Sequence, residues 1–198
     1  SEFALRKELV ETLAALGKWS EALEEARDMA VRWGSGTFEG TWGKLEEAEL
    51  LWRSGKFRDA REAYDAVKGE VDANEELALK YGVGRARQAG QEGKWEDMKG
   101  HLDTVWNTVG EERLEETPLA LHAMSGYYLE VGSSAEASRW ALRALRSVEQ
   151  TRSWHDYPMV SARVSANLAI LGDTKSSLKV LGKALSAATV TRSDLHSI

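Results

Sequence analysis

Apolar residues recur along most of this chain at intervals of three and four positions, which is the spacing of one face of an α-helix. The first such run contains Leu5, Leu9, Leu13 and Leu16. No stretch shows the alternation of apolar and polar residues that indicates a half-buried β-strand. The pattern therefore predicts an all-α protein.

Glycines divide the helical runs at nearly constant intervals. Successive members of the series are 38, 38, 39 and 40 residues apart, and a new amphipathic run opens two residues after each one: Gly17, Gly55, Gly93, Gly132 and Gly172. A period of about 20–50 residues is typical of a solenoid, in which each unit buries its apolar face against the next unit. A glycine just after a helix also adopts the left-handed conformation without the cost of a side chain.

Each repeat is expected to hold a helix A before its glycine and a helix B after it. The A helices are predicted at residues 3–16, 41–54, 74–92, 118–131 and 157–171, and the B helices at 19–33, 57–70, 95–109, 134–150 and 174–188. The repeats then cover residues 3–36, 41–73, 74–112, 117–152 and 157–189, and we expect residues 1–198 to form a single domain.

The B helices share a pattern of small or compact residues at positions 5, 9 and 12 after the glycine. The sets are Ala22, Ala26 and Met29; Ala60, Tyr64 and Val67; Met98, Leu102 and Val105; Ala137, Ala141 and Ala144; and Ser177, Leu181 and Ala184. A small residue soon after the turn lets two antiparallel helices approach closely, so we expect these positions to be buried.

On these residues the chain resembles the tetratricopeptide repeat (TPR) family, whose motif runs Gly-x-aromatic-x-x-Ala-x-x-x-aromatic. The segment Gly55 to Tyr64 follows the motif closely, and Gly17 to Ala22 follows its first half. The resemblance covers almost the whole chain and weakens in the last two repeats, where Ser134 and Thr174 replace the aromatic residue. The usual period of the family is about 34 residues, so this chain is most similar to the long repeats of bacterial regulatory and adaptor proteins. The resemblance implies a right-handed superhelical solenoid of about five antiparallel helix pairs.

In this family helix A lines a concave groove that holds a peptide or helix of a partner protein. Carried over by position from each turn glycine, the resemblance gives a partner-binding set: Lys7, Glu11, Trp42, Glu49, Trp52, Arg53, Lys80, Arg87, Gln91 and His122. Aromatic and arginine side chains carry much of the energy of protein interfaces, and basic groups bind carboxylates. For Trp42 and Trp52, burial in the core is the alternative to a place in the groove. The asparagine-containing carboxylate clamp of the chaperone-binding members is not found in the first two A helices.

The other tryptophans are expected to pack rather than to bind. Trp19 and Trp95 occupy the aromatic position of the turn, and a role in filling the space between repeats is expected for Trp33, Trp106, Trp140 and Trp154.

Motifs of catalysis and metal binding are not found. The four histidines are scattered, cysteine is absent, and the chain has neither a His-Glu-x-x-His pair nor a phosphate-binding glycine loop. The glycines of Tyr81-Gly82-Val83-Gly84 fall inside a predicted helix, which argues against a nucleotide site. We therefore expect no enzymatic activity and no cofactor.

A second candidate surface is a basic stripe in the fourth B helix. Arg139, Arg143 and Arg146 follow one another at helical spacing. Such a stripe can contact phosphates or an acidic protein, but a solvated face is the simpler interpretation. The net charge of −6 also disfavours nucleic acid as a partner.

Charge and hydrophobicity differ between the two ends of the chain. Residues 1–132 contain 17 basic and 27 acidic residues, whereas nine basic and five acidic residues follow from Ser133 onward. The last helix carries Leu178, Leu181 and Leu185, and the residues that follow are short and polar for a capping helix. We expect this end to be covered, either by self-association through the C-terminal repeat, head to tail, or by further repeats.

Targeting signals are also lacking. No apolar run reaches the ~18–20 residues that span a bilayer, so we expect no membrane span and a cytoplasmic location. Ser1-Glu2-Phe3 lacks the regions of a signal peptide and is expected to be a cloning remnant.

Together these features predict a protein–protein interaction scaffold that binds a peptide or helix of a partner in its groove. The alternative is a ligand- or partner-sensing regulatory module of a larger signalling or transcription-regulator protein.

Overall fold

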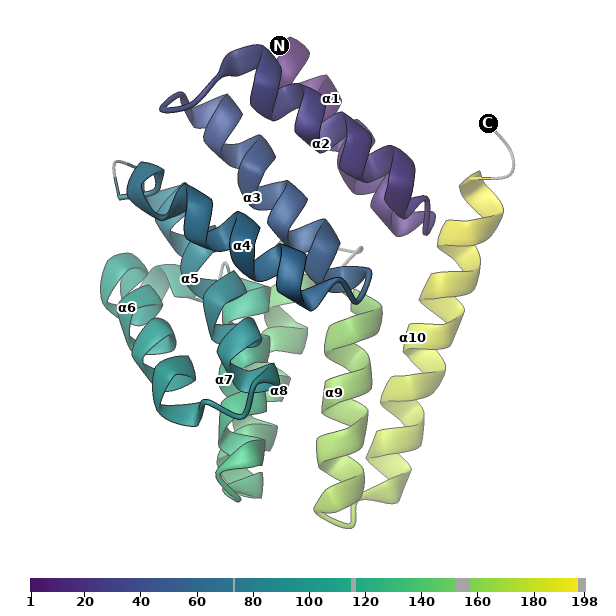
Figure 1. The fold of residues 1–198 in the computed structure, drawn as a ribbon. Coiled ribbons are helices and arrows are strands. Elements are labelled where there is room, and N and C mark those ends of the chain that lie inside the picture. The colour runs from purple at the N-terminus through teal and green to yellow at the C-terminus, as the bar shows by residue number, and fades with distance from the viewer. Residues whose placement is uncertain (73, 115–116, 152–156, 196–198) are drawn as a thin grey trace. The chain divides into compact units, whose positions relative to one another are not determined.

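A computed structural model describes residues 1–72, 74–114, 117–151 and 157–195. Within these ranges the chain forms ten α-helices and one short 3-10 helix, and no strand (Figure 1). The helices follow one another as antiparallel pairs joined by short turns, so the predicted all-α class of TPR-like helix pairs is confirmed.

The chain forms two compact units, Ser1–Thr108 and Val109–Ile198. The first contains α1 (Glu2–Ala15), α2 (Trp19–Trp33), α3 (Phe38–Arg53), α4 (Phe57–Val67) with the 3-10 turn η1 (Lys68–Glu70), α5 (Glu75–Gln91) and most of α6 (Trp95–Leu114). The second contains α7 (Pro118–Glu130), α8 (Ser134–Thr151), α9 (Tyr157–Ile170) and α10 (Thr174–Leu195). Gly110, with a φ of 70°, interrupts α6 two residues beyond the boundary. That all five repeats make one domain stays a prediction.

The predicted helix bounds agree with the structure to within three residues, except at the end of α6, which is Leu114 rather than residue 109, and at the end of α10. Helix α3 begins at Phe38 rather than at residue 41, because the hydroxyl of Thr37 accepts a hydrogen bond from the Gly40 amide and caps the helix there. Helix α10 continues to Leu195, beyond the predicted residue 188.

The five turns between helices A and B are built alike. All five turn glycines have φ between 71° and 84°. In the first turn the Gly17 amide donates to the carbonyl of Ala14, and the Lys18 amide donates to the carbonyl of Leu13. The other four turns repeat both bonds at the same offsets. This is the Schellman arrangement, which satisfies the last carbonyl groups of a helix.

The predicted close approach of the helices in each pair is confirmed for almost every B-helix position. Of the fifteen positions predicted to be buried, fourteen have less than 9% of their surface exposed. The exception is Leu181 in α10, which is 38% exposed. The aromatic position of the turn is less well covered than expected, since Trp19 and Phe57 are 37% and 44% exposed.

Four aromatic side chains from the first three helices pack together in the first unit. The ring of Phe3 meets the rings of Trp33, Phe38 and Trp42 edge-on, with centroids 5.7–5.8 Å apart. Phe3 therefore packs as part of the folded unit, and Trp33 fills space between repeats as predicted.

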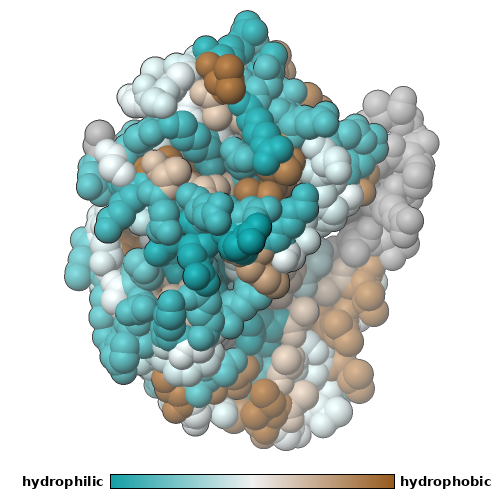
Figure 2. Space-filling model, in the orientation of Figure 1, coloured by the Kyte–Doolittle hydropathy of each residue, from teal (hydrophilic) through white to brown (hydrophobic). Residues whose placement is uncertain are grey.

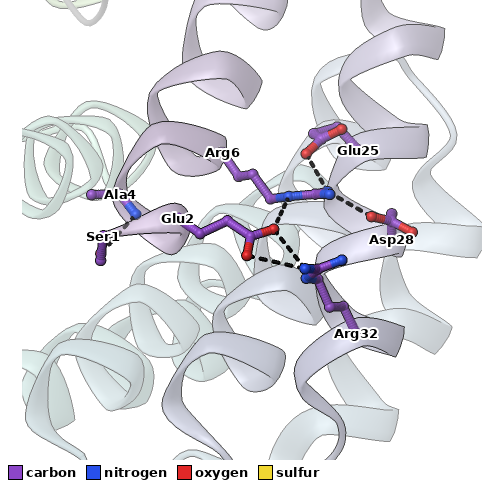
Figure 3. Close-up of polar contacts among 7 residues, drawn as sticks. All are labelled: Ser1, Glu2, Ala4, Arg6, Glu25, Asp28 and Arg32. Atoms are coloured by element: carbon purple, nitrogen blue, oxygen red, sulfur yellow. Dashed lines mark hydrogen bonds and ion pairs between the residues drawn. The ribbon is translucent and has the colours of Figure 1, made fainter.

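Charged side chains also join α1 to α2. Arg6 contacts Glu2, Glu25 and Asp28, and Arg32 of α2 reaches back to Glu2 (Figure 3). The hydrogen bond that Arg6 donates to Asp28 is the largest of the effects that raise the pKa of the Arg6 guanidinium.

The second unit has a more polar core. Ser125 of α7 donates to the carbonyl of Ala137, and Asn167 of α9 donates both to the Ser125 hydroxyl and to the same carbonyl. One repeat later, Ser165 donates to the carbonyl of Ser177 in the same way. Trp140 is buried against Tyr128, as expected for a packing tryptophan. The role expected for Trp154 falls outside the described residues.

The close helix crossing at Ala60 gives a first prediction. Ala60 is fully buried in α4, so Ala60→Leu should lower the free energy of unfolding by about 1–3 kcal/mol through overpacking. Urea unfolding measures the change. Arg58→Leu, at a side chain 86% exposed on the same helix, is the control and should change it by less than about 0.5 kcal/mol. Equal stability of the Ala60→Leu variant and the wild type would contradict the close crossing.

A second prediction uses two glycines to distinguish the energetic cost of the left-handed turn conformation from that of steric overlap. A Cβ added at Gly93, where φ is 71°, or at helical Gly100 would meet no atom within 4 Å. Gly93→Ala should therefore cost about 1–2 kcal/mol for the left-handed conformation alone. Gly100→Ala should instead stabilise by about 0.5–1 kcal/mol, because alanine favours the helix. Thermal unfolding of both variants tests this, and shifts of the same sign would contradict it.

Candidate functional site

Most of the residues predicted to bind a partner gather on three A helices of the first unit. Helix α3 supplies Trp42, Glu49, Trp52 and Arg53, helix α5 supplies Lys80 and Arg87, and helix α1 supplies Lys7. Ion pairs and cation–π contacts connect them. We call these seven residues, with Glu46 and Tyr64, the A-helix cluster.

Glu49 is the centre of the cluster. Its carboxylate is 5% exposed and accepts hydrogen bonds from Arg53 of the same helix (2.7 Å), from Arg87 of α5 and from the Tyr64 hydroxyl of α4 (3.2 Å). One side chain therefore joins three helices that belong to two successive repeats.

The environment of Glu49 changes two pKa values. Burial alone would raise the pKa of this carboxyl, but the charges of Arg87 and Arg53, and then of Lys80, outweigh it and hold the pKa far below its ordinary value of 4.5. Burial, followed by the negative charge of Glu49, raises the pKa of Tyr64 well above 10. At neutral pH the carboxylate is charged and the phenol is protonated, which is the arrangement that the hydrogen bond from Tyr64 requires.

A second ion pair lies one helical turn away. Glu46 is 7% exposed and accepts from Lys80 at 2.5 Å. Two ammonium groups lie near the ring of Trp42, with Lys80 at 5.1 Å and Lys7 at 5.4 Å from its centroid. Trp42 itself is 2% exposed, so of its two predicted roles the structure supports packing in the core.

Trp52 and Arg87 form a stacked pair. The guanidinium carbon of Arg87 lies 4.8 Å from the centroid of the half-buried Trp52 ring, within the range of a cation–π interaction. The Arg87 side chain is only 8% exposed. Its Nε and Nη1 atoms and the Nε1 atom of Trp52 are buried donors without a hydrogen-bond partner.

The burial of Arg87 limits how this residue can be tested. A charged residue on a helix face is solvated by default, whereas Arg87 is buried against Glu49. Removing it would leave the carboxylate without its main counter-charge, which is strongly destabilising in buried pairs.

Sequence reasoning missed two members of the cluster. Tyr64 was assigned only to packing, and Glu46 was not considered, although Glu46 and Glu49 are spaced to share one helix face. The glycine at position 84 belongs here too, because a Cβ there would overlap the Tyr64 ring. The glycines near Tyr81 thus serve helix packing inside α5.

The remaining predicted residues lie apart from the cluster or at its edge. Glu11 is half-buried on α1, Gln91 is exposed at the end of α5, and His122 is buried in α7 of the second unit. Their part in binding stays a prediction.

The basic stripe of α8 makes contacts within its own helix. Arg139 pairs with Glu136 at 3.0 Å, Arg143 lies over the Trp140 ring at 4.3 Å, and Arg146 donates to the carbonyl of Leu142 at 3.4 Å. These contacts agree with a solvated face, and an acidic partner at this stripe stays a prediction.

Two further searches concern the part of the chain that the structure describes. No cluster of three or more histidine and acidic side chains is arranged there to hold a metal ion. None of its helices combines the length and apolar character needed to cross a membrane.

Comparison with known proteins places the fold. The chain is similar to a structure of MamA (residue 41 to the end) from Desulfovibrio magneticus RS-1, with 10% identity, 96% of this chain and 97% of that chain covered, and a TM-score of 0.51. Two further MamA structures align with lower scores: MamA MSR-1 C2 (15% identity, 96% and 98% covered, TM-score 0.46) and an RS-1 double mutant (10%, 96% and 97%, 0.49). The first likeness shows a shared TPR-like helical fold.

Sequence comparisons add nothing to this result. No protein-family model matches the chain. No curated protein matches it either.

The lowered pKa of Glu49 predicts a pH dependence of stability. Because the unfolded state binds the proton first as the pH falls, the contribution of Glu49 is present above about pH 4.5 and is lost as the pH falls toward the folded-state pKa. Between about pH 6 and about pH 3, the wild type should lose more unfolding free energy than Glu49→Gln does. Urea unfolding at several pH values measures this difference.

The matched control is Glu62→Gln, at a side chain 73% exposed on α4. It should follow the wild-type pH profile. A Glu49→Gln profile parallel to that of the wild type would show that the carboxylate is not stabilised by its neighbours.

Proposed function

We propose that the first unit is a protein-binding module that receives an acidic segment of a partner protein on the A-helix cluster. The shared TPR-like fold supports a general protein-binding role, because the A helices of that fold line its binding groove. The acidic character of the partner is inferred from the side chains of the cluster.

The stacked pair of Trp52 and Arg87 is the observation that carries this proposal. Its three buried donors have no acceptor, and a buried donor left without a partner costs about 1–3 kcal/mol. A carboxylate supplied by a partner is an acceptor for such a donor, and its charge strengthens the hydrogen bond that arginine donates to it. Since water does not reach these donors, binding requires the half-buried Trp52 ring to move aside.

The charge of the cluster favours the same ligand. Three basic side chains, Arg53, Lys80 and Arg87, lie together on α3 and α5 and pair with the carboxylates of Glu46 and Glu49. Basic side chains gathered in one place attract an anion, and the Trp52 ring beside Arg87 provides apolar contact. Tryptophan and arginine are also the residues most often found at the energetic centre of protein interfaces. A regulatory module of a larger protein would use the same surface, and that alternative stays a prediction.

The test uses peptides selected for binding. Random linear peptides displayed on phage are selected on the immobilised protein, and the affinities of the enriched peptides are measured by titration. We expect Asp- or Glu-containing peptides to be enriched. Arg53→Ala combined with Lys80→Ala should weaken their binding about tenfold or more, which corresponds to about 1.4 kcal/mol.

Lys80 is the counter-charge of the buried Glu46, so the double variant is expected to be less stable than the wild type, and binding is measured at a temperature where circular dichroism shows that both keep the same helix content. The control combines Arg58→Ala with Lys56→Ala on the exposed side of the next turn and should leave affinity unchanged. Equal affinity for both double variants would move the binding site away from the cluster, and enrichment of basic peptides would contradict the proposed partner.

A further inference from the structure

The first and last helices of this chain expose rows of leucines. On α1, Leu5, Leu9 and Leu16 are 70%, 45% and 44% exposed, and on α10, Leu178 and Leu181 are 64% and 38% exposed. In Figure 2 apolar side chains gather along the described part of α10, at the lower right. Rows of exposed leucine at helical spacing are unusual on a protein that is a monomer in solution.

Inside the chain, helix B of one repeat contacts helix A of the next repeat, and the residues that meet can be numbered from their turn glycines. The residue ten positions after the turn glycine, in helix B, pairs with the residue eight positions before the next turn glycine, in helix A. This gives Arg27 with Glu47 (2.7 Å) between α2 and α3, and Asp65 with Arg85 (2.9 Å) between α4 and α5.

Two further contacts fix the direction of this pairing. Arg61, six positions after its glycine, pairs with Glu92, one position before the next. Ala30, thirteen positions after its glycine, lies so close to Gly43, twelve positions before the next, that an added Cβ would be 2.8 Å from the Ala30 nitrogen. Helix B and the following helix A therefore run antiparallel, in one register that different repeats share.

Four of the five exposed leucines occupy these same positions, and Leu181 stands one position before another of them. Counted from Gly17, Leu16, Leu9 and Leu5 stand one, eight and twelve positions before the turn. Counted from Gly172, Leu178 stands six positions after it and Leu181 nine. The residues nine positions after the four earlier glycines are at most 2% exposed: Ala26, Tyr64, Leu102 and Ala141. Leu181 thus occupies a position that the earlier repeats bury.

We propose that α1 of one copy of this chain docks on α10 of a second copy, in the register that joins successive repeats within the chain. In that register Leu16 lies opposite Leu178, and Leu9 lies opposite Gly182 and beside Leu181. The small Gly182 leaves room for the larger side chain, as Gly43 does for the Ala30 backbone inside the chain.

The charges of the two helix pairs match this contact. Residues 1–33 contain seven acidic and five basic residues, whereas residues 157–186 contain four basic residues and one acidic residue, Asp173. A head-to-tail contact brings the two signs together, and a two-fold contact between like ends would bring like charges together. Because one exposed helix face is small beside a standard interface, we expect a dissociation constant of about 10–100 μM rather than nanomolar affinity.

The contact is heterologous, which permits a decisive test. Leu5→Glu blocks the α1 face and Leu178→Glu blocks the α10 face, and both residues are exposed enough for each variant to fold. In sedimentation velocity the wild type should grow beyond a dimer as its concentration rises above about 100 μM. Each variant alone should stay a monomer, and an equimolar mixture should form a dimer that grows no further, because it holds one intact face of each kind. Val31→Glu, at an 82% exposed residue of α2, is the control and should associate like the wild type.

Other outcomes overturn the proposal. A wild type that stays monomeric throughout would mean that these faces are covered within one chain or by a different partner. Dimers that stop at two and are lost in only one of the two variants would indicate a two-fold contact. The proposal does not depend on the A-helix cluster, since a failure of peptide binding leaves the sedimentation result unchanged.

Discussion

The left-handed glycine between helices A and B is the constraint on which the rest of the structure depends. Each of the five turns repeats the same two backbone hydrogen bonds, so each fixes the direction in which helix B leaves helix A. Once that angle is set, positions 5, 9 and 12 of helix B must face its partner, and small or compact apolar residues fill most of them. The spacing between turns then decides which residues of successive repeats meet. A single backbone conformation, repeated five times, thereby determines both the core and the register of the contacts between repeats.

The two units share this turn geometry but differ in the residues of their cores. Seven residues before the turn glycine, the first unit has Val10, Ala48 and Ala86, all almost fully buried. At the same position the second unit has Ser125 and Ser165, which donate to carbonyl groups of the following helix. Apolar contacts tolerate small shifts between helices, whereas these hydrogen bonds do not. The second unit, whose α8 is lined with alanine, therefore obtains from directed bonds the specificity that larger side chains provide in the first.

What could be predicted from the sequence is what local geometry determines. The turn glycines, and the compact residues at positions 5, 9 and 12 after them, recur along the sequence and could be recognised there. The predicted burial of these positions holds for all of them except Leu181. The candidate site was predicted only in outline. Its residues do come together on α1, α3 and α5, because helical spacing and the turn position place them there. The burial of Arg87 could not be predicted, since it depends on Glu49 in one helix, on Tyr64 in another and on the absence of a side chain at Gly84. Charged residues on a helix face are solvated by default, and only tertiary pairing reverses that expectation.

Gly110 has a consequence for how the chain opens. A continuous helix transmits fraying from turn to turn, because each backbone hydrogen bond holds the next in place. At Gly110 the backbone leaves the helical conformation, so this relay ends within two residues of the boundary between the units. We therefore expect that fraying of the α6 backbone on one side of Gly110 is not carried along the helix to the other side, which native-state hydrogen exchange would show as different amide protection before and after this residue.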